Sequence, residues 1–357
     1  MRRLVSLLAL KSLTLTCTAF DYLPLNAPGS LDGGGSPSYG TWATGTSTAQ
    51  TVGYFKDGTG KTHGFTYDGA NTYVQVDAPG SRDGSGSPSY GTWLGGTDGA
   101  TIVGYYNDGT GKTHGFAYTQ GAYSQLDAPG SFSGAGVPSY GTWATGIYQG
   151  NITGYYKDGT GKTHGFIYDG FTFTQMDAPG SFSGAGAPSY GTWVMGSSAQ
   201  SSVGYYKDGT GKTHGFMLTG GSYSQIDAPG SFSGAGVPSY GTWITGISGN
   251  NVVGYYKDGT GKTHGFLFDG ISYSILDASG SLDGGGSPAY GTWANGISGD
   301  TISGYYLDGT GKAHGFLTVI PEPSYVSIAY LASLLAILSS SRTRKRKDTL
   351  CAIAPKI

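Results

Sequence analysis

The 357-residue chain is poor in the residues on which many enzymes and nucleic-acid-binding proteins depend. Its two cysteines, Cys17 and Cys351, lie near opposite ends, so no disulfide framework holds the fold. Charged residues make up 12% of the chain, and between positions 20 and 320 there are 11 Lys and Arg against 20 Asp, a balance of −9. Because nucleic-acid backbones are bound by clustered cations, this composition argues against a nucleic-acid partner.

The chain also lacks any histidine or tryptophan outside a repeat. The six histidines follow one another at a first interval of 51 residues and then at intervals of 50, and the six tryptophans keep the same spacing. They are His63, His114, His164, His214, His264 and His314, and Trp42, Trp93, Trp143, Trp193, Trp243 and Trp293. A catalytic constellation needs a set of side chains that occurs once, so we expect no enzymatic activity.

Glycine and tyrosine are abundant, with 67 and 28 copies, which indicates a turn-rich β protein. A period near 50 over residues 20–319 predicts one repeat array. In the third copy, runs rich in Thr, Tyr, Phe and Ile predict strands at 140–147, 151–158, 163–169 and 171–177. Four antiparallel strands per repeat make one β-propeller blade, so we expect an all-β, six-bladed propeller.

The two ends of the array predict how it closes. The last repeat stops after "HGFLTV" (314–319) and lacks its fourth strand, whereas "AFDYLPLNAPGS" (19–30) matches the segment that ends the other units. A ring can pair this N-terminal strand into the sixth blade and so hide both edges. An open solenoid would need capping repeats, which the sequence does not contain.

The motif "KDGTGKTHGF" (157–166) combines a glycine-rich loop with a histidine. A phosphate loop opens a helix, whereas this Lys-Thr leads into a predicted strand, and a calcium loop needs several carboxylates where each copy has one Asp. We therefore expect a hairpin turn. For His164 we expect an inter-blade hydrogen bond, because zinc requires three or four ligands and each blade has one His and no Cys. No cofactor or metal is expected.

The tryptophans leave two alternatives open. Trp143 in "SYGTW" stands near Tyr140 and next to a long Gly/Pro/Ser-rich connection. Such a pair can anchor the packing of the blade. Alternatively, it can stack on a sugar ring, and the six tryptophans would then form six equivalent weak sites that bind with avidity.

The termini predict export. A basic start and apolar run followed by "TCTA" indicate a signal peptide over residues 1–19. Near the other end, residues 324–341 would form a helix of about 27 Å, enough to span a bilayer. The cluster that follows should stay in the cytoplasm, and it comprises Arg342, Arg344, Lys345, Arg346 and Lys347.

With Pro321, Glu322 and Pro323 directly before the apolar stretch, residues 320–347 resemble the PEP-CTERM sorting signal of Gram-negative bacteria. The resemblance implies recognition by an exosortase, removal of the tail near the Pro-Glu-Pro motif, and delivery to the cell surface or extracellular matrix. A tail at 348–357 departs from that pattern. The repeats, with "GYYKDGTGKTHGF" and "DAPGS", are similar to the HAF extracellular repeat family, which implies no particular activity.

These features lead to a hypothesis and two rivals. The first is a non-enzymatic structural or adhesive component of the envelope or exopolysaccharide (biofilm) matrix, with matrix proteins or exopolysaccharide as partners. The second is a multivalent, lectin-like carbohydrate-binding propeller. An enzyme would need residues that break the repeat symmetry near the axis, and variable positions such as Ala144, Val194 and Ile244 are apolar.

Overall fold

The computed structural model describes residues 20–31, 39–81, 90–132, 140–182, 190–232, 240–281 and 290–321. Residues 21–319 form one compact unit. None of the described segments forms a helix that could cross a membrane. The predicted signal peptide, Glu322, Pro323, the apolar stretch at 324–341 and the basic cluster lie outside the described residues.

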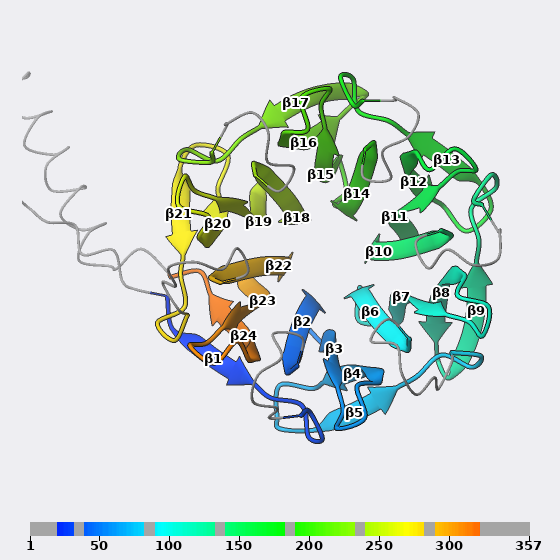
Figure 1. The fold of residues 1–357 in the computed structure, drawn as a ribbon, viewed down its shortest axis with the longest axis vertical. Coiled ribbons are helices and arrows are strands. Elements are labelled where there is room, and N and C mark those ends of the chain that lie inside the picture. Colours follow the sequence, from blue (N-terminus) through cyan, green and yellow to red (C-terminus); the bar gives the residue numbers. More distant parts are fainter. Residues whose placement is uncertain are drawn as a thin grey trace, which may run out of the picture. The chain divides into compact units, whose positions relative to one another are not determined.

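The compact unit consists of 24 strands in six four-stranded antiparallel sheets arranged around an axis (Figure 1). Blade 1 contains β2 (Thr41–Thr46), β3 (Thr51–Lys56), β4 (Thr62–Tyr67) and β5 (Tyr73–Val76), and blade 2 contains β6 (Thr92–Thr97), β7 (Thr101–Asn107), β8 (Thr113–Thr119) and β9 (Ala122–Leu126). Blade 3 contains β10 (Thr142–Tyr148), β11 (Asn151–Lys157), β12 (Thr163–Tyr168) and β13 (Phe173–Met176), and blade 4 contains β14 (Thr192–Ser197), β15 (Ser201–Lys207), β16 (Thr213–Thr219) and β17 (Ser222–Ile226). Blade 5 contains β18 (Thr242–Ser248), β19 (Asn251–Lys257), β20 (Thr263–Phe268) and β21 (Tyr273–Leu276), and blade 6 contains β22 (Thr292–Ser298), β23 (Thr301–Leu307), β24 (Ala313–Val319) and β1 (Tyr22–Leu25).

The expected six-bladed propeller and its closure by the N-terminal strand are confirmed. Strand β1 pairs antiparallel with β24, with Tyr22 opposite Thr318 and Leu25 opposite Gly315. The joint between blades 6 and 1 repeats the other joints, because the Ala27 amide donates to Thr41 Oγ1 at 2.9 Å, as Ala178 does to Thr192 Oγ1. Closure leaves no unpaired edge on the third strand of the last blade.

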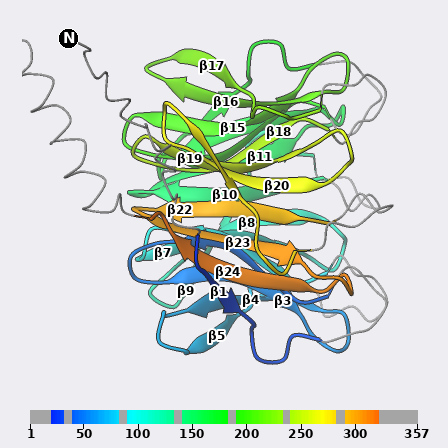
Figure 2. The same cartoon turned by 90° about the vertical axis from the view of Figure 1, so that its left-hand side faces the viewer.

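The core lies between neighbouring blades. One phenylalanine on the third strand of every blade is only 0–1% exposed: Phe65, Phe116, Phe166, Phe216, Phe266 and Phe316. Between blades 1 and 2, Val52 and Val76 of one blade pack with Leu94 and Phe116 of the next. Each blade therefore buries its apolar face against its neighbour. Figure 2 shows the strands of the blades from the side.

A ring of glycines narrows the axial channel, and we call it the glycine waist. A Cβ added at any of its members would lie 2.8–3.5 Å from the Cα of the corresponding glycine in the next blade. The members are Gly45, Gly96, Gly146, Gly196, Gly246 and Gly296. Only residues without a side chain allow the six inner strands to approach this closely. The waist separates two chambers on the axis.

Candidate functional site

The repeated glycine-rich motif forms the predicted hairpin turn. In blade 3, residues 158–162 connect β11 to β12, and Gly161 adopts a φ of 89°. Asp158 Oδ1 accepts hydrogen bonds from the Thr160 amide (2.9 Å), the Thr160 hydroxyl (2.7 Å) and the Lys162 amide (3.0 Å). Partial burial opposes ionisation, but these bonds outweigh it and lower the pKa of Asp158. This carboxylate thus stabilises its own turn.

The histidine is part of a network within its own blade, so the expected inter-blade hydrogen bond is wrong. His164 Nδ1 lies 2.8 Å from Asp177 Oδ2, and Nε2 lies 3.3 Å from Asp158 Oδ2. The cause is the register of β12 and β13, which pairs Gly165 with Met176 and so places Asp177 beside the ring. The hydrogen bond to Asp177 raises the pKa of His164 although burial opposes it. Among the described residues, no group of three or more His, Cys, Asp or Glu could hold a metal ion.

The six tryptophans lie on the innermost strands, around the axis. Each indole stacks on a tyrosine of the second strand in its own blade, with ring centroids 4.7–5.2 Å apart. In four of the six joints the tyrosine of one blade also meets the next indole edge-on at 6.4–6.5 Å. Trp42, Trp193, Trp243 and Trp293 are only 8–9% exposed. The tryptophans thus pack in one aromatic ring and do not form six separate platforms at blade mouths.

This ring surrounds a cavity of about 320 Å³ on one side of the glycine waist, which we call the aromatic chamber. Its walls include Trp93 and Trp293 together with Tyr54, Tyr105, Tyr155, Tyr255 and Tyr305. Its inner end is formed by residues next to the waist, among them Thr44, Thr145, Met195, Thr245 and Asn295. No charged side chain lines it among the described residues.

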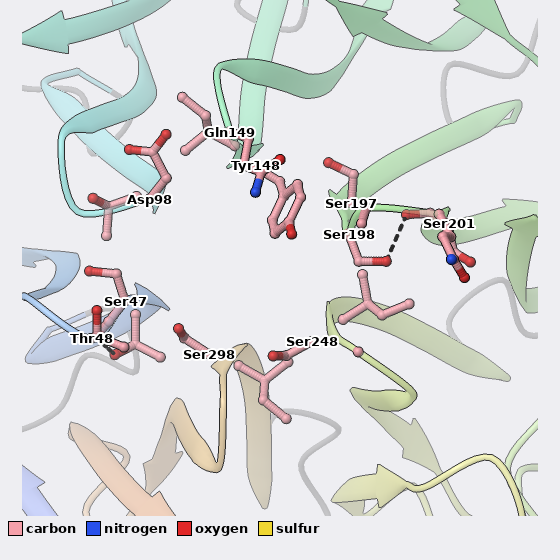
Figure 3. A pocket seen from close by; sticks show the side chains of 18 of the residues that line it. Ser47, Thr48, Asp98, Tyr148, Gln149, Ser197, Ser198, Ser201, Ser248 and Ser298 are labelled. Atoms are coloured by element: carbon pink, nitrogen blue, oxygen red, sulfur yellow. Dashed lines mark hydrogen bonds between the residues drawn. The ribbon is translucent and has the colours of Figure 1, made fainter.

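On the other side of the waist lies a larger cavity of about 500 Å³, which we call the turn chamber (Figure 3). It is built by the turns between the first and second strands of the blades. Labelled in Figure 3 are Ser47, Thr48, Asp98, Tyr148, Gln149, Ser197, Ser198, Ser201, Ser248 and Ser298. Ile147, Ile247 and Ile297 complete the lining near the waist.

The turn chamber offers hydroxyl and amide groups but little charge. Asp98 is its single carboxylate, and no Lys, Arg, His or Cys belongs to its described lining. The hydroxyl of Ser197 is buried and has no hydrogen-bond partner in the described part of the chain, whereas Ser198 donates to the Ser201 carbonyl at 3.4 Å. The described lining thus offers hydrogen-bond donors and acceptors to a bound molecule.

The turn chamber was missed by reasoning from the sequence, which identified only apolar variable positions. Ala144, Val194 and Ile244 are fully buried in the core between blades. The strongest variation among the repeats lies in the turns, which read "STAQ", "DGA", "YQG", "SAQ", "SGN" and "SGD" from position 47 or its counterpart onward. Aligning the six copies reveals this variation, but only the closed ring shows that the turns converge on one cavity.

No protein-family model matches the chain, and comparison with curated proteins finds no relative. Solved structures similar to it include a fungal lectin from Aleuria aurantia, described as a six-bladed β-propeller with a novel fucose recognition mode, at a TM-score of 0.44 and 14% identity over 77% of this chain and 89% of that one. AofleA from Arthrobotrys oligospora has a TM-score of 0.41 and 14% identity over 76% and 77%. TolB from Acinetobacter baumannii has a TM-score of 0.40 and 11% identity over 77% and 53%. At these values the similarities identify no ligand for this chain.

Proposed function

We propose that this protein is a non-enzymatic carbohydrate-binding propeller of the cell envelope or extracellular matrix, and that a neutral sugar occupies the turn chamber. The observation that carries the proposal is the lining of that chamber. Hydroxyl and amide groups of Ser198, Gln149 and Asn250 lie above an aliphatic part formed by Ile247 and Ile297. A sugar ring presents the matching surface, with hydroxyl groups at its edge and C–H groups on its faces.

The charges and size of the chamber narrow the choice of ligand. Phosphate and carboxylate ligands require cations or several aligned donors, and the described lining contains no cation. A volume of about 500 Å³ lies within the range of small-molecule sites and suits one or two sugar units. Tyr148 projects into the cavity from blade 3 and provides the aromatic surface on which a sugar ring can stack (Figure 3).

The position of the chamber on the axis gives the test. Titration calorimetry of the full-length chain with neutral mono- and disaccharides should give one site per chain, because six turns share one cavity. The variant Tyr148→Ala with Gln149→Ala should lose binding. The control Phe171→Ala, which removes a 94% exposed aromatic ring from another turn of blade 3, should bind normally. The proposal would be refuted by six sites per chain, by unchanged binding in the variant that lacks the Tyr148 and Gln149 side chains, or by no binding of any neutral sugar.

A second candidate, a structural or adhesive role, is favoured by one observation. Phe171 and Ile271 are 94% and 93% exposed at the tips of the turns after β12 and β20. Because successive strands reverse direction, these tips lie at the same end of the propeller as the turn chamber. Exposed apolar side chains of this kind suit contact with a partner surface. Adhesion of the purified protein to a matrix that weakens in Phe171→Ser with Ile271→Ser would support this role.

For its location, we propose export and sorting by the C-terminal signal predicted over residues 321–347. Its apolar part would hold the precursor in the inner membrane until an exosortase releases the propeller to the surface or matrix. Replacing Pro321, Glu322 and Pro323 by alanine should leave the protein in the membrane fraction with its full mass. Release of that variant at the normal rate would contradict this route.

A further inference from the structure

The aromatic chamber contains a set of polar groups that the proposed function does not use. They belong to the tyrosines in the middle of the second strand of each blade, and all of these except Tyr205 line the cavity: Tyr54, Tyr105, Tyr155, Tyr205, Tyr255 and Tyr305. Within the described residues none of their hydroxyl groups has a hydrogen-bond partner, whereas the adjacent Tyr156 donates to Gln175 Oε1 at 2.8 Å. Phenol hydroxyls without a protein partner around a cavity of about 320 Å³ can donate hydrogen bonds to a bound acceptor.

These hydroxyls lie close enough to influence one another. Burial raises the pKa of Tyr205 well above its ordinary value, and repulsion from Tyr255, Tyr155 and Tyr105 adds to the shift. Burial likewise raises the pKa of Tyr305, with contributions from Tyr54 and Tyr255. Five of these tyrosines line the same cavity, so groups from neighbouring and more distant blades meet around one space. At neutral pH all six remain protonated donors.

Positive charge lies near the aromatic ring that surrounds this space. In four blades a lysine follows two residues after the axial tyrosine on the same strand: Lys56, Lys157, Lys207 and Lys257. Side chains two residues apart on a strand share a face, and Lys157 Nζ indeed lies 6.0 Å from the centre of the Trp143 ring. Burial lowers the pKa of all four lysines. None of them forms an ion pair with a carboxylate in the described part of the chain.

The same lysine position differs in the two remaining blades together with its cross-strand partner. Lys157 is paired with Thr163, whose buried hydroxyl has no partner. In blade 2 the lysine is replaced by Asn107, which accepts a hydrogen bond from Thr113 at 2.7 Å. In blade 6 the pair is Leu307 and Ala313, without any polar group. The four lysine blades are therefore the ones that keep a positive charge at this position, paired across the strands with a threonine whose buried hydroxyl has no partner.

We infer that the aromatic chamber is a second binding site, specific for an oxyanion group carried by an acidic saccharide such as a hexuronic acid. The axial tyrosine hydroxyls donate to the carboxylate, and the ammonium groups of Lys157 and its counterparts balance its charge. The aromatic walls contact the sugar ring. The saccharide part of this inference rests on the proposed carbohydrate function, whereas the anion part stands without it.

The test compares ligands on the full-length protein, with tryptophan fluorescence and calorimetry as readouts, since indoles form the walls. Glucuronate and galacturonate should bind and change the fluorescence, and the matched neutral sugar glucose should not change it. Sodium sulfate should compete with glucuronate, and raising the salt concentration should weaken binding. Sulfate binding without glucuronate binding would reduce the site to one for a free inorganic anion and overturn the saccharide part. No binding of either anion would overturn the whole inference.

Matched variants locate the site. Replacing Tyr105, Tyr205 and Tyr305 by Phe removes three axial hydroxyls and should weaken glucuronate binding by about tenfold or more. Replacing their neighbours Tyr106, Tyr206 and Tyr306 by Phe removes the same number of atoms from the opposite face of the same strands and should change the affinity by less than about twofold. Equal effects of the two triple variants would overturn the inference.

The lysines provide a second pair of variants. Lys157→Gln with Lys207→Gln should weaken glucuronate binding by about tenfold and reduce its salt dependence. The control Lys162→Gln with Lys212→Gln removes two lysines that contact Asp177 and Asp227 at 3.3 and 3.6 Å, and should leave binding unchanged. Glucuronate binding that survives Tyr148→Ala while neutral sugars are lost would establish two separate sites. Glucuronate binding that disappears in Tyr148→Ala would place the anion in the turn chamber and refute the inference.

Discussion

The two chambers of the channel are built by the same six hairpins. The aromatic residues around one chamber are the same in every blade, whereas the turn residues around the other differ from blade to blade. Around the aromatic chamber every blade has the same tryptophan and the same tyrosine, whereas around the turn chamber all six turns differ. The aromatic side chains pack on one another, so any change in one of them disturbs its neighbours. The turn residues mostly face an open cavity, so the fold places few demands on them. Residues that vary freely in otherwise near-identical units are those available for selecting a ligand.

We expect the largest effect on both chambers when the ring itself is opened. Deleting residues 20–29 removes β1, exposes the edge of β24 and removes the hydrogen bond from the Ala27 amide to Thr41 Oγ1. We expect this deletion to abolish cooperative thermal unfolding or to lower Tm more than any single substitution, because both chambers depend on closure. Deleting residues 348–357 is the control. A melting curve like that of the intact chain would contradict closure by β1.

A smaller change tests the aromatic side alone. Trp193→Ala removes a buried indole that contacts Tyr205 and Tyr155, and should lower the free energy of unfolding by about 3–5 kcal/mol. Ser198→Ala in the turn chamber of the same blade should change it by less than about 0.5 kcal/mol. Urea unfolding followed by circular dichroism measures both. Similar losses in the two variants would mean that the turns also support the fold.

The histidine–aspartate pairs, such as His164 with Asp177, predict that the free energy of unfolding depends on pH. The residues of the two chambers do not contribute to this dependence. Hydrogen bonds that the imidazole N–H groups donate to aspartate carboxylates raise the pKa of five histidines above 6.5: His63, His114, His164, His214 and His264. This stabilisation is complete below 6.5 and is lost as the pH rises through the folded-state pKa. Asp177, with its pKa lowered from 3.8, loses its contribution as the pH falls through the folded value. The free energy of unfolding should therefore be higher near pH 5.5 than near pH 8.5, with a smaller difference in His164→Gln.

The smallest expected effect concerns the blade that closes the ring. There Asn26 occupies the position of Asp177, and His314 Nδ1 contacts its amide oxygen at 3.2 Å. Asn26→Asp would give blade 6 the same His–Asp pair as the other five and should raise the free energy of unfolding by about 0.5–1 kcal/mol near pH 5.5. Asn26→Ala serves as the control and should lower it. A decrease in Asn26→Asp would mean that the extra carboxylate is not accommodated.

The sequence by itself determined the repeat, the four strands of each blade, the hairpin turns and the closure. These features depend on local patterns, such as the Asp158 turn between two β-rich runs and the strand at Tyr22–Leu25 that matches the missing one. The partner of His164 was not predictable in this way, because whether a hydrogen bond lies within or between blades depends on strand register and spacing.

Only the tertiary structure decided which repeated residues share the axis. A spacing of 50 residues does not tell how far from the axis a repeated residue lies, so Trp143 could equally have been on a blade surface. The closed ring places it against Tyr155 and Tyr105 and brings six different turns around one cavity. The physical reason is that rotational closure turns one side chain per blade into a ring of six, and a property of that ring exists in no single repeat.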